Sequence, residues 1–119
     1  MTVVESIRSL FYDRRLIFNN EKELQDEIAD LLDRAQIQYA REFRVGSKCI
    51  LDFLLIESRT ALEIKVRGAT EADILRQVHR YALLPAISAI IVIAPRPFNM
   101  PRELNRKPID VVAIFASII

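Results

Sequence analysis

Apolar residues recur with two different periods along this chain, and the changes of period predict where helices give way to strands. Between residues 21 and 35 they lie three or four positions apart, which is typical of the buried face of a helix. Asn20 offers an N-cap for this helix, and Glu23 follows three residues later. A similar spacing within residues 3–18 predicts a short amphipathic helix, or an arm that packs on a partner.

The middle of the chain predicts an antiparallel meander. Short polar links join three β-prone runs, at residues 38–45, 49–56 and 60–66. A helix then extends from an N-cap at Thr70 to Leu84, where Pro85 stops it.

The last third of the chain predicts two more strands. The run at 86–94 is almost wholly apolar, so we expect a strand that is covered on both faces. A loop at 95–108 leads to a final strand at 109–118. The order of all these elements indicates an α/β or α+β fold with a mixed sheet flanked by helices.

Composition predicts one domain that spans residues 1–119, with the N-terminal helix or arm at about 1–19. The chain has 119 residues and is 51% hydrophobic, which suffices for a single core. Its one cysteine, Cys49, cannot form an internal disulfide, and we expect it to fill the core of a cytoplasmic protein. No signal peptide is visible, and the most apolar segment, 81–94, is too short to cross a membrane.

Three charged residues lie inside two apolar strands of the meander, where an unpaired charge is costly: Asp52, Glu63 and Lys65. If the turn is centred between Glu57 and Ser58, opposed residues have numbers of constant sum, and Asp52 faces Glu63. Alternation along the strand places Glu63 and Lys65 on one face. The same argument places five apolar neighbours on the other face: Leu51, Phe53, Leu62, Ile64 and Val66.

Two facing carboxylates repel each other unless a cation or a proton lies between them. Oxygen ligands of this kind suit Mg²⁺ or Mn²⁺, and the carbonyl of Ile64 is a natural additional ligand. Lys65, beside such an ion, would orient or deprotonate an attacking water, or balance charge on a phosphate. The pattern therefore predicts metal-assisted phosphodiester hydrolysis.

The spacing from Asp52 through ten residues to Glu63-Ile64-Lys65 resembles the signature of the PD-(D/E)XK nuclease superfamily. Gln77 and Tyr81 resemble the QxxxY motif of its RecB-like branch. The resemblance covers residues 20 to about 95 and implies a restriction-endonuclease-like αβββαβ core. Leu51 departs from the family pattern, because it stands where the family name has proline.

The resemblance also implies roles for individual residues. Asp52 and Glu63 would be metal ligands and Lys65 the catalytic lysine, while Gln77 and Tyr81 would support the site or the substrate. An acid of the first family helix would touch the metal or its water shell. Glu21 is favoured for this role because its direction falls near the middle of the apolar stripe, and Glu23 and Glu27 are the competitors.

The net charge of +1 gives no overall sign of a nucleic-acid partner, but basic residues concentrate in two segments. The candidate contacts to nucleic acid are Arg76, Arg80, Arg96, Arg102, Arg106 and Lys107. Arg76 has a competing interpretation as the partner of Asp73 in a local ion pair. His79 is expected to be a solvated helix residue, because it points away from Gln77 and Tyr81.

The chemistry predicts a Mg²⁺- or Mn²⁺-dependent endonuclease or exonuclease that hydrolyses DNA. The alternative is a non-catalytic nucleic-acid-binding or assembly module with the same fold. The apolar ends of the chain, including residues 115–119, also predict packing on a partner, for which a homodimer is one arrangement.

Overall fold

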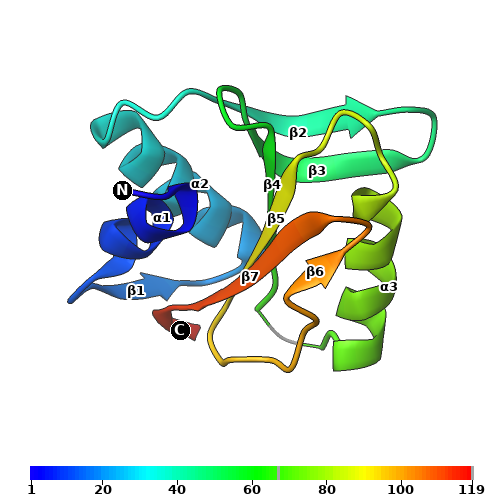
Figure 1. Cartoon of the computed structure of the whole chain (residues 1–119). Coiled ribbons are helices and arrows are strands. Elements are labelled where there is room, and N and C mark those ends of the chain that lie inside the picture. Colours follow the sequence, from blue (N-terminus) through cyan, green and yellow to red (C-terminus); the bar gives the residue numbers. More distant parts are fainter. Residues whose placement is uncertain (67, 119) are drawn as a thin grey trace.

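A six-stranded mixed sheet forms the centre of the molecule in the computed structural model, which describes residues 1–66 and 68–118, with only the backbone described for 115–118 (Figure 1). The order of the strands is β2-β3-β4-β5-β7-β6. Their bounds are β2 Tyr39–Val45, β3 Cys49–Leu55, β4 Thr60–Ile64, β5 Ala89–Ala94, β6 Glu103–Leu104 and β7 Lys107–Ala113.

The sheet combines the predicted antiparallel meander with a parallel half. Strands β2, β3 and β4 pair in antiparallel fashion, as their short links require. Strands β4, β5 and β7 are parallel, so their carboxyl ends meet at one edge of the sheet. The prediction that the apolar run near 90 is covered on both faces is confirmed, because five of the six residues of β5 are buried.

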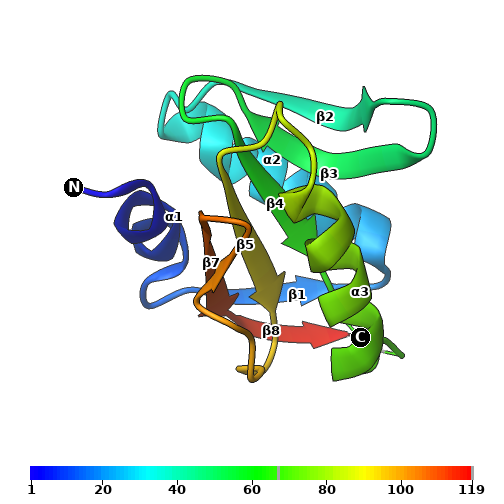
Figure 2. The same ribbon diagram turned by 45° about the vertical axis from the view of Figure 1, so that its right-hand side comes forward.

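Helices cover both faces of the sheet. Helices α1 (Val3–Phe11) and α2 (Glu21–Arg34) lie on one side and α3 (Glu71–Ala82) lies on the other (Figures 1 and 2). Each side has its own apolar cluster, one with Ile28, Leu62 and Ile91, the other with Val78, Ala61 and Ile90. The predicted α/β architecture with a mixed sheet and flanking helices is thus confirmed.

Side-chain caps fix the starts of α2 and α3, at the two N-caps that the sequence predicted. The Asn20 side chain accepts a hydrogen bond of 2.9 Å from the Glu23 N–H, and Thr70 accepts one of 3.1 Å from the Asp73 N–H. Each bond satisfies a backbone donor that the first turn leaves unpaired. Because α2 starts directly after Asn20, Glu21 is held in the first turn of that helix.

The expectation for residues 3–18 was only half right. Helix α1 begins with a capping box between Thr2 and Glu5 and ends at Phe11. The chain then forms a strand, β1 (Arg15–Phe18), which pairs in parallel with β8 (Phe115–Ile118). Burial alternates along β1, so that Leu16 and Phe18 lie in the core. A strand of four residues is too short for this period of two to be recognised in the sequence.

The end of the chain also differs from the expectation. The predicted loop at 95–108 contains β6 and the start of β7, and the predicted strand at 109–118 divides into β7 and β8, which belong to different sheets. Residue 119 lies outside the described part, as do the side chains of 115–118, on which the expectation of an apolar docking end depended. No helix in the described part of the chain is long and apolar enough to cross a membrane.

Candidate active site

The predicted register of the hairpin between β3 and β4 is correct. Phe53 pairs with Leu62, Leu54 with Ala61 and Leu55 with Thr60, the register that brings Asp52 opposite Glu63. The regular ladder ends at the first of these pairs, however, so Asp52 and Glu63 are not a ladder pair. The two strands separate at this point, and the charged residues lie where they part.

Where the two strands separate, the Asp52 side chain takes the place of a backbone hydrogen-bond acceptor. Its Oδ2 accepts a hydrogen bond of 2.8 Å from the Ile64 N–H. The next amide along, that of Lys65, donates instead to the Ile93 carbonyl of β5 at 2.9 Å. Because the N–H and C=O of one strand residue point to the same side, the Ile64 carbonyl faces β3 together with its N–H.

Glu63 is a buried carboxylate, with a side chain only 3% exposed. Its Oε1 lies 3.2 Å from Lys65 Nζ, and its Oε2 accepts a hydrogen bond of 3.2 Å from the Tyr81 hydroxyl. The Lys65 side chain is 23% exposed. The ammonium group therefore stands between the buried carboxylate and solvent.

Helix α3 supports this carboxylate through two residues that lie one turn apart. Gln77 Nε2 donates to the Tyr81 hydroxyl oxygen at 2.9 Å, which leaves the phenolic hydrogen for Glu63. The same hydroxyl lies 3.4 Å from the Ile50 carbonyl of β3. The predicted support of the site by Gln77 and Tyr81 is thus a chain of contacts that ends on Glu63.

Burial shifts both acids toward their protonated forms, and the charge of Asp52 adds to the shift of Glu63. Burial and then the charge of Asp52 raise the pKa of Glu63 to about 7, against the opposing effects of Lys65 and Tyr81. Burial also raises the pKa of Asp52, although the hydrogen bond from Ile64 and the charge of Lys65 oppose it. Burial and the Glu63 charge raise the pKa of Tyr81, so its hydroxyl stays a donor at neutral pH.

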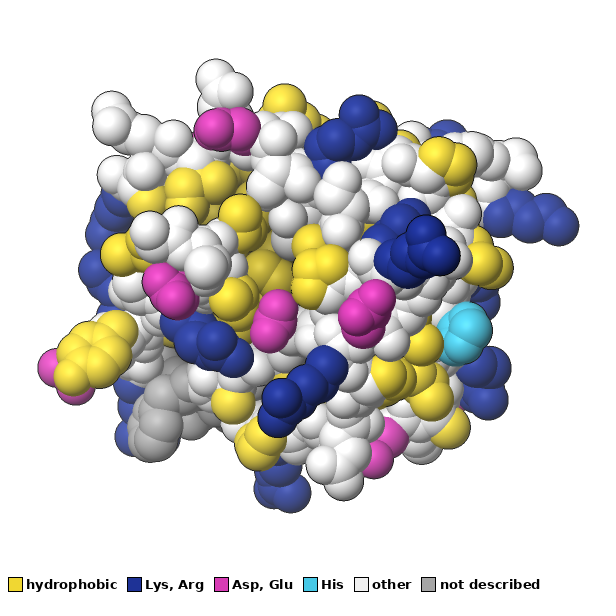
Figure 3. Space-filling view, viewed as in Figure 1, with side chains coloured by type: hydrophobic (Ala, Val, Ile, Leu, Met, Phe, Trp, Pro, Cys, Tyr) yellow, Lys and Arg dark blue, Asp and Glu magenta, His cyan; other side chains and the backbone are white. Residues whose placement is uncertain are grey.

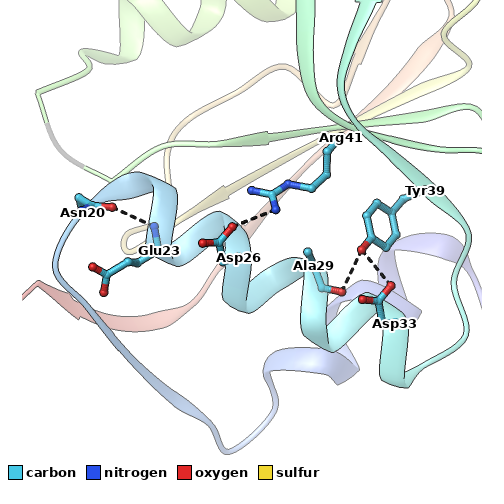
Figure 4. Close-up of polar contacts among 7 residues, drawn as sticks. All are labelled: Asn20, Glu23, Asp26, Ala29, Asp33, Tyr39 and Arg41. Atoms are coloured by element: carbon cyan, nitrogen blue, oxygen red, sulfur yellow. Dashed lines mark hydrogen bonds and ion pairs between the residues drawn. The ribbon is translucent and has the colours of Figure 1, made fainter.

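Among the acids of α2, Glu21 is coupled to the site. Burial, and then the charge of Asp52, raise the pKa of Glu21, and Lys65 lowers it. Glu23 is occupied elsewhere, because its carboxylate accepts hydrogen bonds from the Asn19 backbone and side chain. Further along the helix, Asp26 pairs with Arg41 of β2 (Figure 4).

Tyr39 ties the later turns of α2 to β2 as well. Its hydroxyl donates to Asp33 at 2.9 Å and lies 3.4 Å from the Ala29 carbonyl (Figure 4). These contacts hold α2 against the meander along its length. The first turn, which carries Glu21, is thereby positioned at the end of the sheet where β4 stops.

The site could hold a divalent ion through two carboxylates and a carbonyl. Asp52 and Glu63 supply hard oxygen atoms, and the Ile64 carbonyl faces the same side as the amide bound by Asp52. Within the described residues, no group of three or more His, Cys, Asp or Glu side chains is close enough to hold a metal. An ion bound here would therefore retain several waters, as Mg²⁺ commonly does.

The predicted nucleic-acid contacts do not gather in one place. Arg96 follows β5 at the carboxyl edge of the parallel strands, the edge at which Lys65 follows β4, whereas Arg106 and Lys107 lie at the opposite end of β7. Lys107 Nζ donates to the Leu84 carbonyl after α3. Arg76 forms the predicted ion pair with Asp73.

Two more of these arginines are exposed away from that edge. Arg80 lies on α3, and the Arg102 carbonyl accepts a bond from the Ile109 amide of β7. In the space-filling view, acidic and basic side chains are interspersed and form no continuous basic stripe (Figure 3). His79 is at the surface, as expected (Figure 3).

Strand β3 is distorted beside the site in a way that the sequence did not predict. Leu51 was expected on the same face as Phe53, but it packs in the cluster around α3 while Phe53 packs on the other side. The register places Glu42 across from Asp52, and Glu42 has a left-handed backbone with φ of 48°. The sequence does not predict this change of face along β3 or the left-handed backbone of Glu42, since glutamate rarely adopts such a conformation.

Comparison of the chain with protein-family models, with curated proteins and with solved structures found no match.

Proposed function

We propose that this protein is a metal-dependent nuclease that hydrolyses DNA phosphodiester bonds. The observation that carries the proposal is the meeting of Asp52, Glu63 and Lys65 where β3 and β4 separate. Acids whose pKa is raised in this way, here to about 7 beside a second acid and a lysine, cluster at functional sites.

The donor set fits a hard divalent cation. Asp52, Glu63 and the Ile64 carbonyl would hold Mg²⁺ or Mn²⁺, with Glu21 near its water shell. The ion would act as a Lewis acid and lower the pKa of a bound water. Its charge would also remove the repulsion that now raises the pKa of Glu63.

The remaining residues have roles that follow from their contacts. Lys65 is held by Glu63 at the solvent side of the site, where its ammonium would orient the attacking water or stabilise charge on the phosphate. The Tyr81 hydroxyl fixes the other oxygen of Glu63, and Gln77 fixes Tyr81. This support would keep the carboxylate in one orientation during the reaction.

The arrangement of elements supports the same proposal. The order α2, β2, β3, β4, α3, β5 follows the αβββαβ order of restriction-endonuclease-like cores. The positions of Asp52, Glu63-Ile64-Lys65 and Gln77-Tyr81 within it match the resemblance to the RecB-like branch of the PD-(D/E)XK superfamily. A cytoplasmic nuclease is consistent with the single, buried cysteine.

The test is a cleavage assay with single-stranded, duplex and branched DNA in Mg²⁺ or Mn²⁺. We expect Glu63→Gln and Lys65→Ala to lower the cleavage rate by roughly 100-fold or more, the effect of removing one group that stabilises charge in a transition state. Glu57→Gln is the matched control, because Glu57 is an exposed glutamate in the turn of the same hairpin. That variant should cleave within about twofold of the wild type.

The proposal is wrong if the wild type cleaves none of the substrates, or if Glu63→Gln and Lys65→Ala cleave as fast as the wild type. Chelation with EDTA should also abolish cleavage.

The second candidate is a non-catalytic nucleic-acid-binding or assembly module. The observation that favours it is the absence of a third acidic ligand close to Asp52 and Glu63 among the described residues. Thermal melting with Mn²⁺ separates the two candidates. Stabilisation that disappears in Asp52→Asn supports the nuclease, whereas DNA binding that needs neither metal nor Asp52 supports the module.

A further inference from the structure

A cavity of about 550 Å³ opens between the α1–β1 connection and the carboxyl ends of two central strands. Its apolar lining is formed by Pro95 and Ala113, together with the small exposed parts of the core residues Phe11 (7%) and Ile114 (4%). The charged lining comes from Asp13, Arg14 and Arg15. None of these charged residues belonged to the predicted site, because the sequence does not indicate that the turn after α1 reaches the end of β5.

The cavity lies at the same edge of the sheet as the candidate active site. The Lys65 amide binds the Ile93 carbonyl on one side of β5, and the Ile114 amide binds the Ala94 carbonyl on the other, at 2.9 and 2.8 Å. Two strand spacings therefore separate the backbones of Lys65 and Ile114, about 10 Å. A short stretch of a nucleic-acid strand spans such a distance.

The lining combines the two kinds of surface that a nucleotide needs. A guanidinium group binds phosphate through paired hydrogen bonds, and the apolar surface of Pro95 and Ala113 offers a contact for the face of a base. The volume falls within the range of small-ligand pockets and exceeds what a phosphate alone would fill. A base that is paired in a duplex is not free to enter such a pocket.

We propose that this cavity, which we call the Arg14 cavity, binds one unpaired nucleotide of the strand that the active site engages. The inference rests on the proposed function for the identity of the substrate, but the binding itself requires no cleavage. It implies a preference for DNA with a single-stranded segment over continuous duplex. Asp13 opposes this binding, because its carboxylate repels the phosphate from within the same cavity.

Binding of a fluorescent single-stranded oligonucleotide, measured by anisotropy without divalent metal over a range of salt concentrations, tests the proposal. We expect Arg14→Gln to weaken binding roughly 3- to 10-fold and to reduce the salt slope by about 0.7, the value for one phosphate contact on a single strand. Asp13→Asn should tighten binding. Asn also tolerates the left-handed backbone at this position, where φ is 55°.

The matched control is Arg34→Gln, since Arg34 is an exposed arginine near the end of α2 that pairs with Asp30. It should bind as the wild type does. Competition with inorganic phosphate and with a deoxynucleoside monophosphate separates simple phosphate binding from nucleotide binding, and the proposal requires the nucleotide to compete better. Duplex of the same length should bind more weakly than the single strand.

The proposal is overturned if Arg14→Gln and Arg34→Gln bind alike, if phosphate competes as well as the nucleotide, or if duplex binds as tightly as the single strand. Because these measurements need no metal, they are independent of cleavage. Loss of cleavage in Glu63→Gln with Arg14-dependent binding intact would support both proposals. Arg14-dependent binding by a wild type that cleaves nothing would support the cavity alone.

Discussion

At the scale of single residues, Glu63 makes stability depend on pH in the direction opposite to that of an ordinary salt-bridged acid. Its pKa is about 7 in the folded chain and 4.5 in a model peptide, so the folded state retains a proton that the unfolded state has lost. The free energy of unfolding must then decrease as pH rises from about 4.5 to about 7. The shift corresponds to a loss of up to about 3 kcal/mol.

Urea unfolding at several pH values without divalent metal measures this effect. The wild type should lose stability between pH 5 and pH 7.5, and Glu63→Gln, which cannot ionise, should lose much less. Mn²⁺ added at pH 7.5 should restore stability to the wild type alone. Equal pH profiles for the two proteins would show that the burial of Glu63 does not control its ionisation.

At the scale of elements, helix α3 contributes to the site through one hydrogen bond from Tyr81 to Glu63. Tyr81→Phe removes this bond and keeps a ring that is 2% exposed, so the packing of α3 should persist. Because the bond lowers the pKa of Glu63, its loss should raise that pKa further. The stability decrease with pH should then extend to higher pH, and cleavage should decrease roughly 10-fold or more.

The exposed Tyr12 provides the control, since Tyr12→Phe removes a hydroxyl from a side chain that is 82% exposed. A Tyr81→Phe variant with the pH profile and cleavage rate of the wild type would show that the hydroxyl does not position Glu63.

Most elements were predictable because their causes are local. Helix α2 has an N-cap and an apolar stripe, and the meander has short links that leave little choice of topology. Strand β1 was missed because its partner, β8, lies about a hundred residues away and its four residues are too few to show a period. Pairing over such a distance depends on the whole fold.

The candidate site was likewise predictable where its causes are local. The register of one symmetric turn brought Asp52 and Glu63 to the same place, and helical direction selected Glu21. The bond from Ile64 to Asp52 was not predicted, because it exists only where the ladder ends. The charged lining of the Arg14 cavity was missed for a similar reason, since a turn after α1 approaches a strand eighty residues later.

At the scale of the whole molecule, most apolar residues near the start of the chain pack in the core of the same chain. Ile7, Phe11, Leu16 and Phe18 are buried, so they do not argue for a partner. Ile17 is the apolar residue of β1 that faces outward, with 54% of its surface exposed. The homodimer stays a prediction, and Ile17 is a residue through which to test it.

Two substitutions separate folding from association. Ile91→Ala in β5, at a side chain 2% exposed, should lower the free energy of unfolding by about 2–5 kcal/mol. Ile17→Ala should change the unfolding of a monomer by less than about 0.5 kcal/mol. If light scattering finds a wild-type dimer, Ile17→Ala should increase its dissociation, and an unchanged dimer would exclude β1 from the interface.

The left-handed backbone of Glu42 affects whether the outer strand β2 can pair with a second copy of the protein. Strand β2 is an outer strand of the sheet, and an outer strand offers unpaired amides and carbonyls on which another chain can build. Glu42 interrupts that row in the middle of β2, between two arginines, Arg41 and Arg44. The distortion beside the site therefore also disfavours edge-to-edge pairing of a second copy with β2.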